Sequence, residues 1–314
     1  MNLNIENNKV LLFFNKFKIL NPQENKRILA YWLLAPILIF FIVWNVIPLF
    51  WMVGLGFYKY TLTSSEGVKF VGLKNYIDIL SSADIWHSLS RTLLFALLGV
   101  GIQTLLGLVL GFLFWGSKKM PGRRMAVTLL FCPMILTPVA AGLYFKLIFD
   151  PIFGIVNYFL KNWFGITIDF IGNAKWAFPA VILVDTWMWT PFMILITLAA
   201  LGSVPKAELE SAEVDRLPWV KRILFIILPR CKFILMLGIL LRTIDSFKTM
   251  DLVHTMTFGG PGNVTELIAI YLYRRAFVSF TIGSSSALAV ITLLTAIAFT
   301  SIYLYILSYK ERKA

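Results

Sequence analysis

The sequence predicts an all-α membrane protein that crosses the bilayer about six times. Hydrophobic residues make up 59% of its 314 residues and charged residues 14%, whereas a soluble domain carries about a quarter charged residues. The charges fall in clusters that are separated by long uncharged runs. The formal net charge is +13, but the basic residues flank apolar stretches and form no aromatic-interleaved patch, so we expect no nucleic-acid partner.

Six stretches are apolar enough to cross the hydrocarbon core, which takes roughly 20 residues of helix. They cover about residues 29–53, 92–116, 125–149, 176–200, 232–254 and 285–307. The fifth is the least regular, because Arg242, Asp245, Lys248 and Asp251 interrupt its second half. The chain therefore divides into an amphipathic tail (1–28), a membrane domain (29–308) and a short C-terminal tail (309–314).

The lysine and arginine residues indicate the orientation, since they accumulate in loops on the cytoplasmic side. If both termini lie inside, the inside segments hold 18 of the 29 Lys and Arg residues. The apolar patch at 10–14 is too short for the core of a signal peptide. We therefore expect both tails and the loop 204–229 in the cytoplasm, and lipid around the spans.

The loop 204–229 is the longest charged segment between two spans. Pro205 suits the first turn of a helix, and Glu208 and Glu210 lie where the helix dipole favours negative charge. Pro218 then interrupts the helix, so we predict a short helix, a turn and a second short helix that Pro229 stops. An exposed loop also explains these charges, and the residues alone leave open whether the segment docks a soluble partner.

A carboxylate in the middle of a span is costly, and Asp185 occupies such a position in VDTWMWTPF. It either lines a solute path, with Trp187 and Trp189 stacking on a sugar, or pairs with a base on a neighbouring helix. Arg242, Asp245 and Lys248 are spaced by three and can pair along a helix. They either form an ion-pair ladder beside a wet vestibule or contact the solute.

Three further features bear on the fold and on the class of function. Gly107 and Gly111 form a GxxxG helix-packing motif, a helix is expected after Gly72 and another around Trp86, and an amphipathic segment covers Glu266–Phe280. Phosphate-loop, HExxH and CxxC motifs are missing from the sequence. The sequence therefore carries no enzyme signature, and we expect this chain to bind no metal or cofactor. An intramembrane hydrolase in particular lacks a nucleophile and base pair. One possible function is a gradient-driven secondary transporter with Asp185 as its proton site, and it stays the alternative to the function that the resemblance below implies.

Several segments resemble a known family of transport proteins. Glu210-Ser211-Ala212, Asp215 and, later, Ile227-Leu228-Pro229 resemble the EAA loop of binding-protein-dependent ABC importer permeases. FVGLKNYIDIL (70–80), VDTWMWTPF (184–192) and LRTIDSFKTMDLVHTMTFGGPGN (241–263) are similar to its sugar-importer branch, the MalF-like or UgpA-like permeases. The resemblance covers nearly the whole chain from Leu29 onward.

The resemblance implies a permease of the bacterial cytoplasmic (inner) membrane that imports a sugar, oligosaccharide or related polyol. It implies a second, usually non-identical permease, two ATPase subunits that bind ATP and Mg²⁺, and an external solute-binding protein as partners. The docking residues implied for the ATPase are Glu210, Ser211, Ala212, Asp215, Arg216 and Leu217. Ser211 replaces the family's usual alanine and Arg216 its glycine, so we expect a different turn geometry, with Pro218 making the turn.

Overall fold

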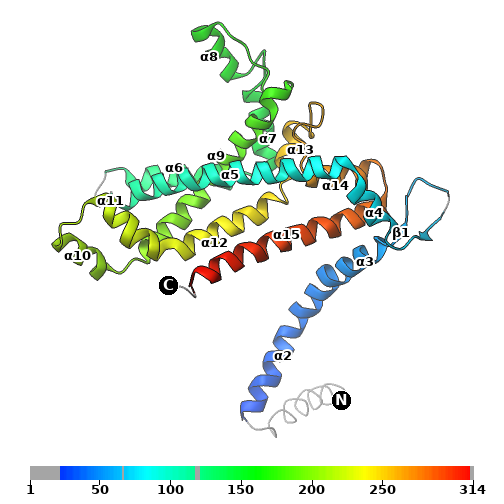
Figure 1. Cartoon of the computed structure of the whole chain (residues 1–314), viewed down its shortest axis with the longest axis horizontal. Helices are drawn as coiled ribbons and strands as arrows, with labels where there is room; N and C mark the ends of the chain where they lie inside the picture. Colours follow the sequence, from blue (N-terminus) through cyan, green and yellow to red (C-terminus); the bar gives the residue numbers. More distant parts are fainter. Residues whose placement is uncertain (1–21, 66, 117–120, 312–314) are drawn as a thin grey trace, which may run out of the picture.

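The computed structural model describes residues 22–65, 67–116 and 121–311; most of the predicted N-terminal tail and the last three residues lie outside them. The described chain is mostly helical (Figure 1). Its elements in order are α2 (Pro22–Phe41), η1 (Ile42–Val46), α3 (Ile47–Leu55), β1 (Tyr58–Lys59), β2 (Lys69–Phe70), α4 (Lys74–Ser81), α5 (Ala83–Gly116), α6 (Arg123–Ile135), α7 (Pro138–Ile148), α8 (Ile155–Phe164), α9 (Ala174–Gly202), α10 (Lys206–Val214), α11 (Trp219–Arg222), η2 (Ile223–Ile227), α12 (Leu228–Ser246), α13 (Asp251–Met256), α14 (Ile268–Tyr273), η3 (Arg274–Val278) and α15 (Ile282–Glu311).

Five helical segments of the described chain are long and apolar enough to cross a membrane. They are Leu29–Leu55, Ala83–Trp115, Ala174–Gly202, Trp219–Ser246 and Ile282–Tyr305. α6 and α7 together pass the same test but are bent by 98°, which gives up to six spans. The count matches the prediction, and the shape of the third span does not.

The span expected at 125–149 is broken between α6 and α7. Leu136 and Thr137 are extended there, with ψ angles of 141° and 148°. Proline disfavours the helical conformation of the residue before it, and Pro138 follows Thr137 directly. The Thr137 hydroxyl then accepts a hydrogen bond from the backbone N–H of Ala140 and caps α7. The apolar run therefore changes direction where the sequence was expected to continue straight.

Two other predicted boundaries shift. α5 begins at Ala83, so the short helix expected around Trp86 is the first part of the second span. α12 ends at Ser246, and α13 begins only at Asp251, so the fifth span is shorter at this end than the predicted 232–254.

Pro229 does not stop a helix as predicted. α11, η2 and α12 follow one another without a gap, and the π-helical turn η2 ends two residues before the proline. In this turn the Leu228 N–H bonds to the Ile223 carbonyl, one residue beyond the α-helical partner. Because proline clashes with the carbonyl four residues before it, the wider turn lets the chain continue past it. The π-helical turn η1 likewise ends two residues before a proline, Pro48.

The centre of the protein is built where α5 packs along α9. A Cβ on Gly107 would lie 2.5 Å from Met193 Cβ, and one on Gly111 would lie 2.5 Å from Thr197 Cγ2. The GxxxG motif therefore brings the two helices together, as small residues do in membrane bundles. α12 packs on both helices, and α7 packs on α13 at the edge of the main core.

Beyond this core, α4 and α14 pack against α15 through a separate apolar cluster that includes Ile79, Ile268 and Leu288. The two-residue strands β1 and β2 pair antiparallel close to it. The span Leu29–Leu55 has no buried share; α3 contacts α15, and α2 extends away from the other helices (Figure 1).

Candidate functional site

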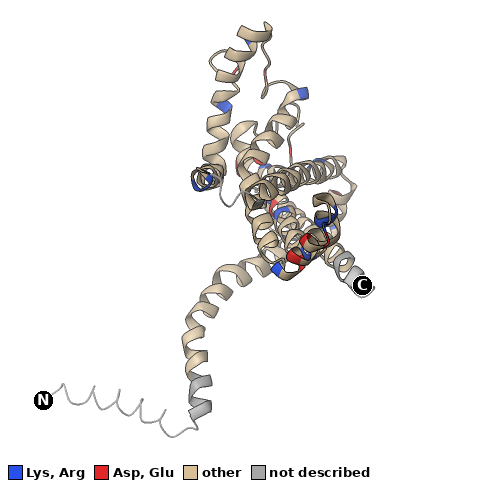
Figure 2. Ribbon diagram, turned by 90° about the vertical axis from the view of Figure 1, so that its left-hand side faces the viewer, with Lys and Arg blue, Asp and Glu red and all other residues tan. Residues whose placement is uncertain are grey.

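Acidic and basic residues gather at the end of the molecule that carries α10 and α11, which faces the viewer in Figure 2. α10 forms here with Glu208 in its first turn, where its charge complements the helix dipole. Ala212 is buried and Leu209 packs on the cluster of Ala200, Leu201, Val204, Ile227, Cys231 and Leu235. One face of α10 therefore packs on the membrane domain, and Glu210 on the other face is exposed.

The C-terminal end of α10 has the hydrogen bonds of a Schellman motif. The Leu217 N–H bonds to the Ala212 carbonyl and the Arg216 N–H to the Glu213 carbonyl, each at 3.0 Å. Arg216 has φ 50°, the left-handed conformation that glycine adopts most easily. The turn thus has the geometry that a glycine at position 216 would give, and the expected change of geometry does not occur.

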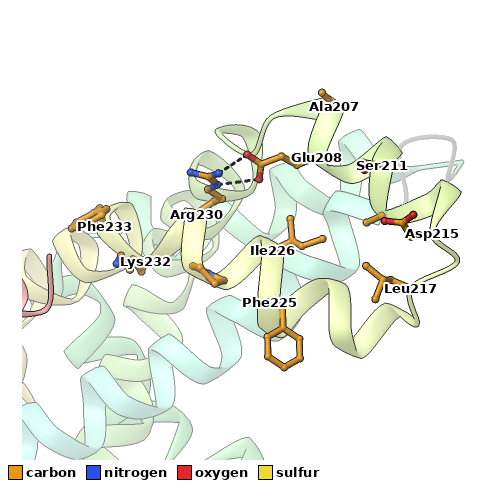
Figure 3. Close-up of a pocket in the computed structure, with 12 residues that line it drawn as sticks. Ala207, Glu208, Ser211, Asp215, Leu217, Phe225, Ile226, Arg230, Lys232 and Phe233 are labelled. Carbon is orange, nitrogen blue, oxygen red and sulfur yellow. Dashed lines mark hydrogen bonds and ion pairs between the residues drawn. The ribbon is translucent and has the colours of Figure 1, made fainter. Parts of the chain in front are cut away.

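A bidentate ion pair connects α10 to the start of α12 (Figure 3). Arg230 Nη2 lies 2.6 Å from Glu208 Oε1, and Arg230 Nε donates to Glu208 Oε2 at 3.0 Å. The pair borders a groove of about 800 Å³ between the two helices. The groove is lined by Ala207, Glu208, Ser211, Ala212, Asp215, Leu217, Phe225, Ile226, Pro229, Arg230, Lys232 and Phe233.

The predicted loop residues thus divide between two positions. Ser211, Ala212, Asp215 and Leu217 line the groove. Glu210 and Arg216 are exposed and are not among the residues that line it. The sequence reasoning placed Glu208 at a helix start but did not identify Arg230 as its partner, because 22 residues separate them.

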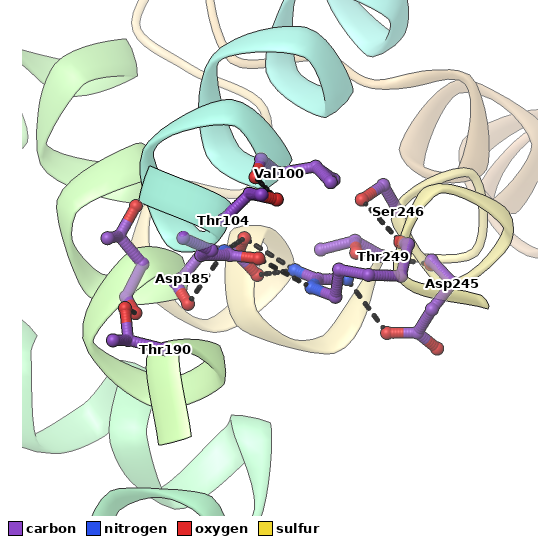
Figure 4. A network of polar contacts seen from close by, with 10 residues as sticks. Val100, Thr104, Asp185, Thr190, Asp245, Ser246 and Thr249 are labelled. Carbon is purple, nitrogen blue, oxygen red and sulfur yellow. Dashed lines mark hydrogen bonds and ion pairs between the residues drawn. The ribbon is translucent and has the colours of Figure 1, made fainter. Parts of the chain in front are cut away.

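A second polar site lies inside the bundle and joins three helices (Figure 4). Asp185 of α9 and Arg242 of α12 are each 1% exposed. Arg242 Nη2 lies 2.7 Å from Asp185 Oδ1 and 2.5 Å from Oδ2. Gln103 of α5 donates to Asp185 Oδ2 at 2.8 Å and accepts from Arg242 Nε at 3.0 Å. We call these three residues the buried triad.

The buried triad supplies the partner that one of the two explanations for Asp185 requires, and Asp185 also lines a cavity, as described below. Its carboxylate is paired with a base on a neighbouring helix, which satisfies the electrostatic requirement of a buried charge. Gln103 was not singled out from the sequence, although a lone amide within an apolar span is a detectable signal. A Cβ on Gly99 would lie 3.3 Å from Asp185 Oδ2, so α5 approaches the carboxylate closely here.

The expected ladder along α12 forms only in its first step. Arg242 Nη1 lies 2.9 Å from Asp245 Oδ2, and the Asp245 side chain is 45% exposed. α12 ends at Ser246, so Lys248 and Asp251 no longer follow the same helical spacing. Lys248 is exposed, and among the described residues it has no ion pair within 4 Å.

The two tryptophans point to different neighbours. Trp189 lies against the Arg242 guanidinium, with Cζ 4.8 Å from the ring centroid, a cation–π arrangement. Trp187 packs edge-on against Phe145 of α7, with ring centroids 5.1 Å apart. A cavity of about 110 Å³ lies beside the triad. Its lining includes Asp185, Trp189, Asp245 and Lys248 together with Pro138 at the α6–α7 break. Trp187 is not part of it.

Among the described residues there is no group of three or more His, Cys, Asp or Glu side chains that could hold a metal ion. The groove combines charged, hydroxyl and apolar side chains, and the buried triad combines charged and amide groups with Trp189 beside them. They can form hydrogen bonds with a polar solute and ion pairs with a protein partner.

Comparison with known proteins gives a family match over most of the chain. Residues 103–310 match the model of the binding-protein-dependent transport system inner membrane component. The trehalose/maltose transport system permease protein MalF of Thermococcus litoralis is 28% identical over 88% of this chain and 92% of its own. The sulfoquinovosyl glycerol transport system permease protein SmoG of Agrobacterium fabrum is 32% identical over 91% and 92%. The sn-glycerol-3-phosphate transport system permease protein UgpA of Brucella abortus is 30% identical over 88% and 93%.

Solved structures agree on the fold. A chain of the bacterial alginate ABC transporter in complex with an alginate pentasaccharide-bound periplasmic protein superposes with a TM-score of 0.77. That match covers 90% of this chain and 94% of the other, at 19% identity. A chain of the MetNI methionine ABC transporter in an inward-facing conformation matches with a TM-score of 0.52 at 14% identity, over 75% and 98%.

Proposed function

The chain belongs to the family of binding-protein-dependent transport system inner membrane components, and on this basis we propose that it is the permease subunit of an ATP-driven importer for a sugar, oligosaccharide or related polyol. The substrate class rests on the relatives, whose names give trehalose, maltose, sulfoquinovosyl glycerol and glycerol 3-phosphate as cargo. These solutes share several hydroxyl groups. The single observation that carries the proposal is α10, a short helix with one face packed on the membrane domain and the other exposed.

We infer that α10 docks a cytoplasmic ATPase. Its exposed face presents Glu210, and its groove side presents Ser211 and Asp215. The Schellman turn at Arg216 and Leu217 fixes the direction in which the chain leaves the helix. Leu209 and Ala212 hold this helix against the membrane domain, so a movement of the ATPase can act on the membrane domain through α10. This chain would need no cofactor of its own, since ATP and Mg²⁺ would bind to the ATPase subunits.

The assembly in this proposal contains two permeases, two ATPase subunits and an external solute-binding protein. The second permease would be non-identical, as in the family that the sequence resembles. Both termini of this chain would be cytoplasmic, and lipid would surround its spans. The course of α15 supports the position proposed for the C-terminus, because this helix runs back toward the end of the molecule that carries α10 (Figure 1).

The solute path would pass the cavity beside the buried triad. Trp189 supplies an aromatic face, and Asp245 and Lys248 supply partly or fully exposed polar groups to it. Asp185 and Arg242 are almost wholly enclosed, so their part would be to hold the wall of the path. Trp187 lies against Phe145 and would not contact the solute.

A gradient-driven carrier with Asp185 as its proton site is the competing function. The geometry favours the importer, because the Asp185 carboxylate is engaged by both Arg242 and Gln103 and is only 1% exposed, which leaves it little access to exchange a proton with water. A proton site needs a group that gains and loses its proton during each cycle. Uptake that continues in the presence of a proton uncoupler and stops on depletion of ATP would support the importer.

The test of the proposed function is co-purification of the tagged chain from native membranes, followed by mass spectrometry. We expect an ATPase with a phosphate-binding loop and a second six-span protein to co-purify. Glu210→Ala should release the ATPase and keep the second permease, because the substitution removes an exposed group of α10 and no packed side chain. A chain that purifies alone or only with copies of itself would contradict the proposal.

A further inference from the structure

We propose that the Glu208–Arg230 ion pair transmits the movement of α10 to α12, so that Glu208 and Arg230 are positioning residues that set how much solute is moved per ATP hydrolysed. This inference rests on the proposed docking of an ATPase to α10. It assigns a role to two residues of the groove that are outside the set proposed above to dock the ATPase and that do not line the cavity of the solute path.

The chain that leads from α10 to α12 departs from the α-helical conformation at three places. From α10 the chain passes Arg216 in the left-handed conformation, an extended residue at Pro218 with ψ 147° and the π-helical turn η2. Each of these departs from the α-helix, and π-helical turns are frequent at functional sites. A push on α10 is therefore not carried to α12 along one continuous helix.

The ion pair bypasses these interruptions. Arg230 is the third residue of α12 and Glu208 the third of α10, and their side chains connect the two helices directly. A hydrogen bond of 3.0 Å from Nε and an ion-pair contact of 2.6 Å from Nη2 fix both the distance and the orientation of the guanidinium, since a bidentate arginine–carboxylate pair is geometrically specific. Leu209 and Ala212 attach α10 to the body through apolar contacts, which are non-directional.

The link leads directly to the solute path. α12 begins at Leu228 and carries Arg242, which belongs to the buried triad, and Asp245, which borders the cavity. A displacement of Arg230 along a continuous helix would therefore reach both groups. The Arg230 side chain is 60% exposed and that of Glu208 is 32% exposed, so the pair contributes little to stability and can be broken without unfolding the protein.

The experiment uses the complete transporter in liposomes and measures solute uptake and ATP hydrolysis in the same sample. We expect Glu208→Gln and Arg230→Gln each to lower the uptake per ATP by about threefold to fivefold, the shift that loss of an exposed ion pair can produce. The ATPase should remain bound in both variants. The charge reversal Glu208→Arg with Arg230→Glu should restore most of the ratio, because it re-forms the pair in the opposite sense.

Glu213→Gln is the matched control. It removes the same charge from the same helix, and Glu213 is exposed with no ion pair among the described residues. Its uptake per ATP should equal that of the unmodified protein. An unchanged uptake per ATP in Glu208→Gln and Arg230→Gln would overturn the inference. The inference would also be overturned if the charge reversal lost as much uptake per ATP as each single variant does. Failure of the proposed function is distinguishable, because then the unmodified chain would retain no ATPase or would transport without ATP.

Discussion

The carboxylate of Asp185 on α9 and the guanidinium of Arg242 on α12 form a buried ion pair in which Nη2 lies within 2.7 Å of both carboxylate oxygens. Gln103 on α5 bonds to both partners, so three membrane helices meet at one polar point. Charges at this depth are tolerated when they pair with each other. Removing one partner should therefore cost more than removing both.

Arg242→Gln should destabilise the protein by about 3–5 kcal/mol, because it leaves the Asp185 carboxylate buried without a counter-charge. Asp185→Asn should cost less, since Asp245 still faces Arg242. The double variant Asp185→Asn with Arg242→Gln should recover most of the loss. The measurement is the fraction that stays monodisperse after heating in detergent. Equal stability of Arg242→Gln and the unmodified protein would argue against an uncompensated charge.

Gly107→Ala should destabilise the α5–α9 contact by about 1–3 kcal/mol, the usual cost of overpacking. The added methyl group would lie 2.5 Å from Met193 Cβ and 2.8 Å from the Met193 backbone carbonyl carbon, so a helix must move. Gly101→Ala is the control, because on the same helix its Cβ meets nothing within 4 Å. Thermal stability in detergent compares the two, and a loss of equal size in both would exclude packing as the reason.

Arg216→Gly should stabilise the end of α10 by about 0.5–1 kcal/mol, since glycine adopts the left-handed conformation without the steric cost that a side chain carries. The readout is slower hydrogen exchange of the Leu217 amide, which bonds to the Ala212 carbonyl. Arg216→Ala removes the same charge but keeps a Cβ, so its amide should exchange no more slowly than in the parent. Similar protection in the alanine and glycine variants would attribute the effect to charge.

The turn between α7 and α8 should open in acid. The backbone N–H groups of Phe153 and Ile152 donate to Asp150 Oδ1, each at 2.8 Å, and these bonds hold the pKa of the carboxyl below its ordinary value. A lowered pKa means that the bonds stabilise the turn above the ordinary carboxyl pKa of about 3.9. Their contribution is lost as the pH falls through the lowered value.

Hydrogen exchange of the Ile152 and Phe153 amides, corrected for the intrinsic rate at each pH, measures this opening. Protection should fall below pH about 4 in the parent. Asp150→Asn keeps an acceptor oxygen that does not titrate, so its protection should not depend on pH in this range. A pH-dependent loss of the same size in Asp150→Asn would assign the effect to another group.

The sequence predicted the number of spans, because long apolar runs have few alternative structures in a membrane. It also indicated a close helix contact at Gly107 and Gly111, since these residues leave room on one helix face, but not that α9 is the partner. The break in the third span was missed although Pro138 was visible, because the apolar run is continuous on both sides of it. Proline restricts the backbone of the residues next to it, whereas hydropathy is a property of the whole apolar run and does not reveal a local break.

The candidate sites were only partly predictable. Asp185 and Arg242 were each identified as costly charges, but their partnership depends on how three distant segments pack. Gln103 is 82 residues from Asp185 and 139 from Arg242, so its role follows from the fold alone. At Arg216 the residue type indicated a changed turn, yet the two hydrogen bonds that end α10 impose the left-handed conformation on arginine.

Because α2 lies apart from the other helices (Figure 1), substitutions on it report on what surrounds the protein in the membrane. The span Leu29–Leu55 has no buried share within the chain, so large-to-small substitutions at residues 29–41 of α2 remove no buried side chain from this protein. A position on α2 at which such a change alters assembly or transport therefore marks a contact with lipid or another subunit. A mutational scan of this helix would map the neighbours of the protein in the membrane.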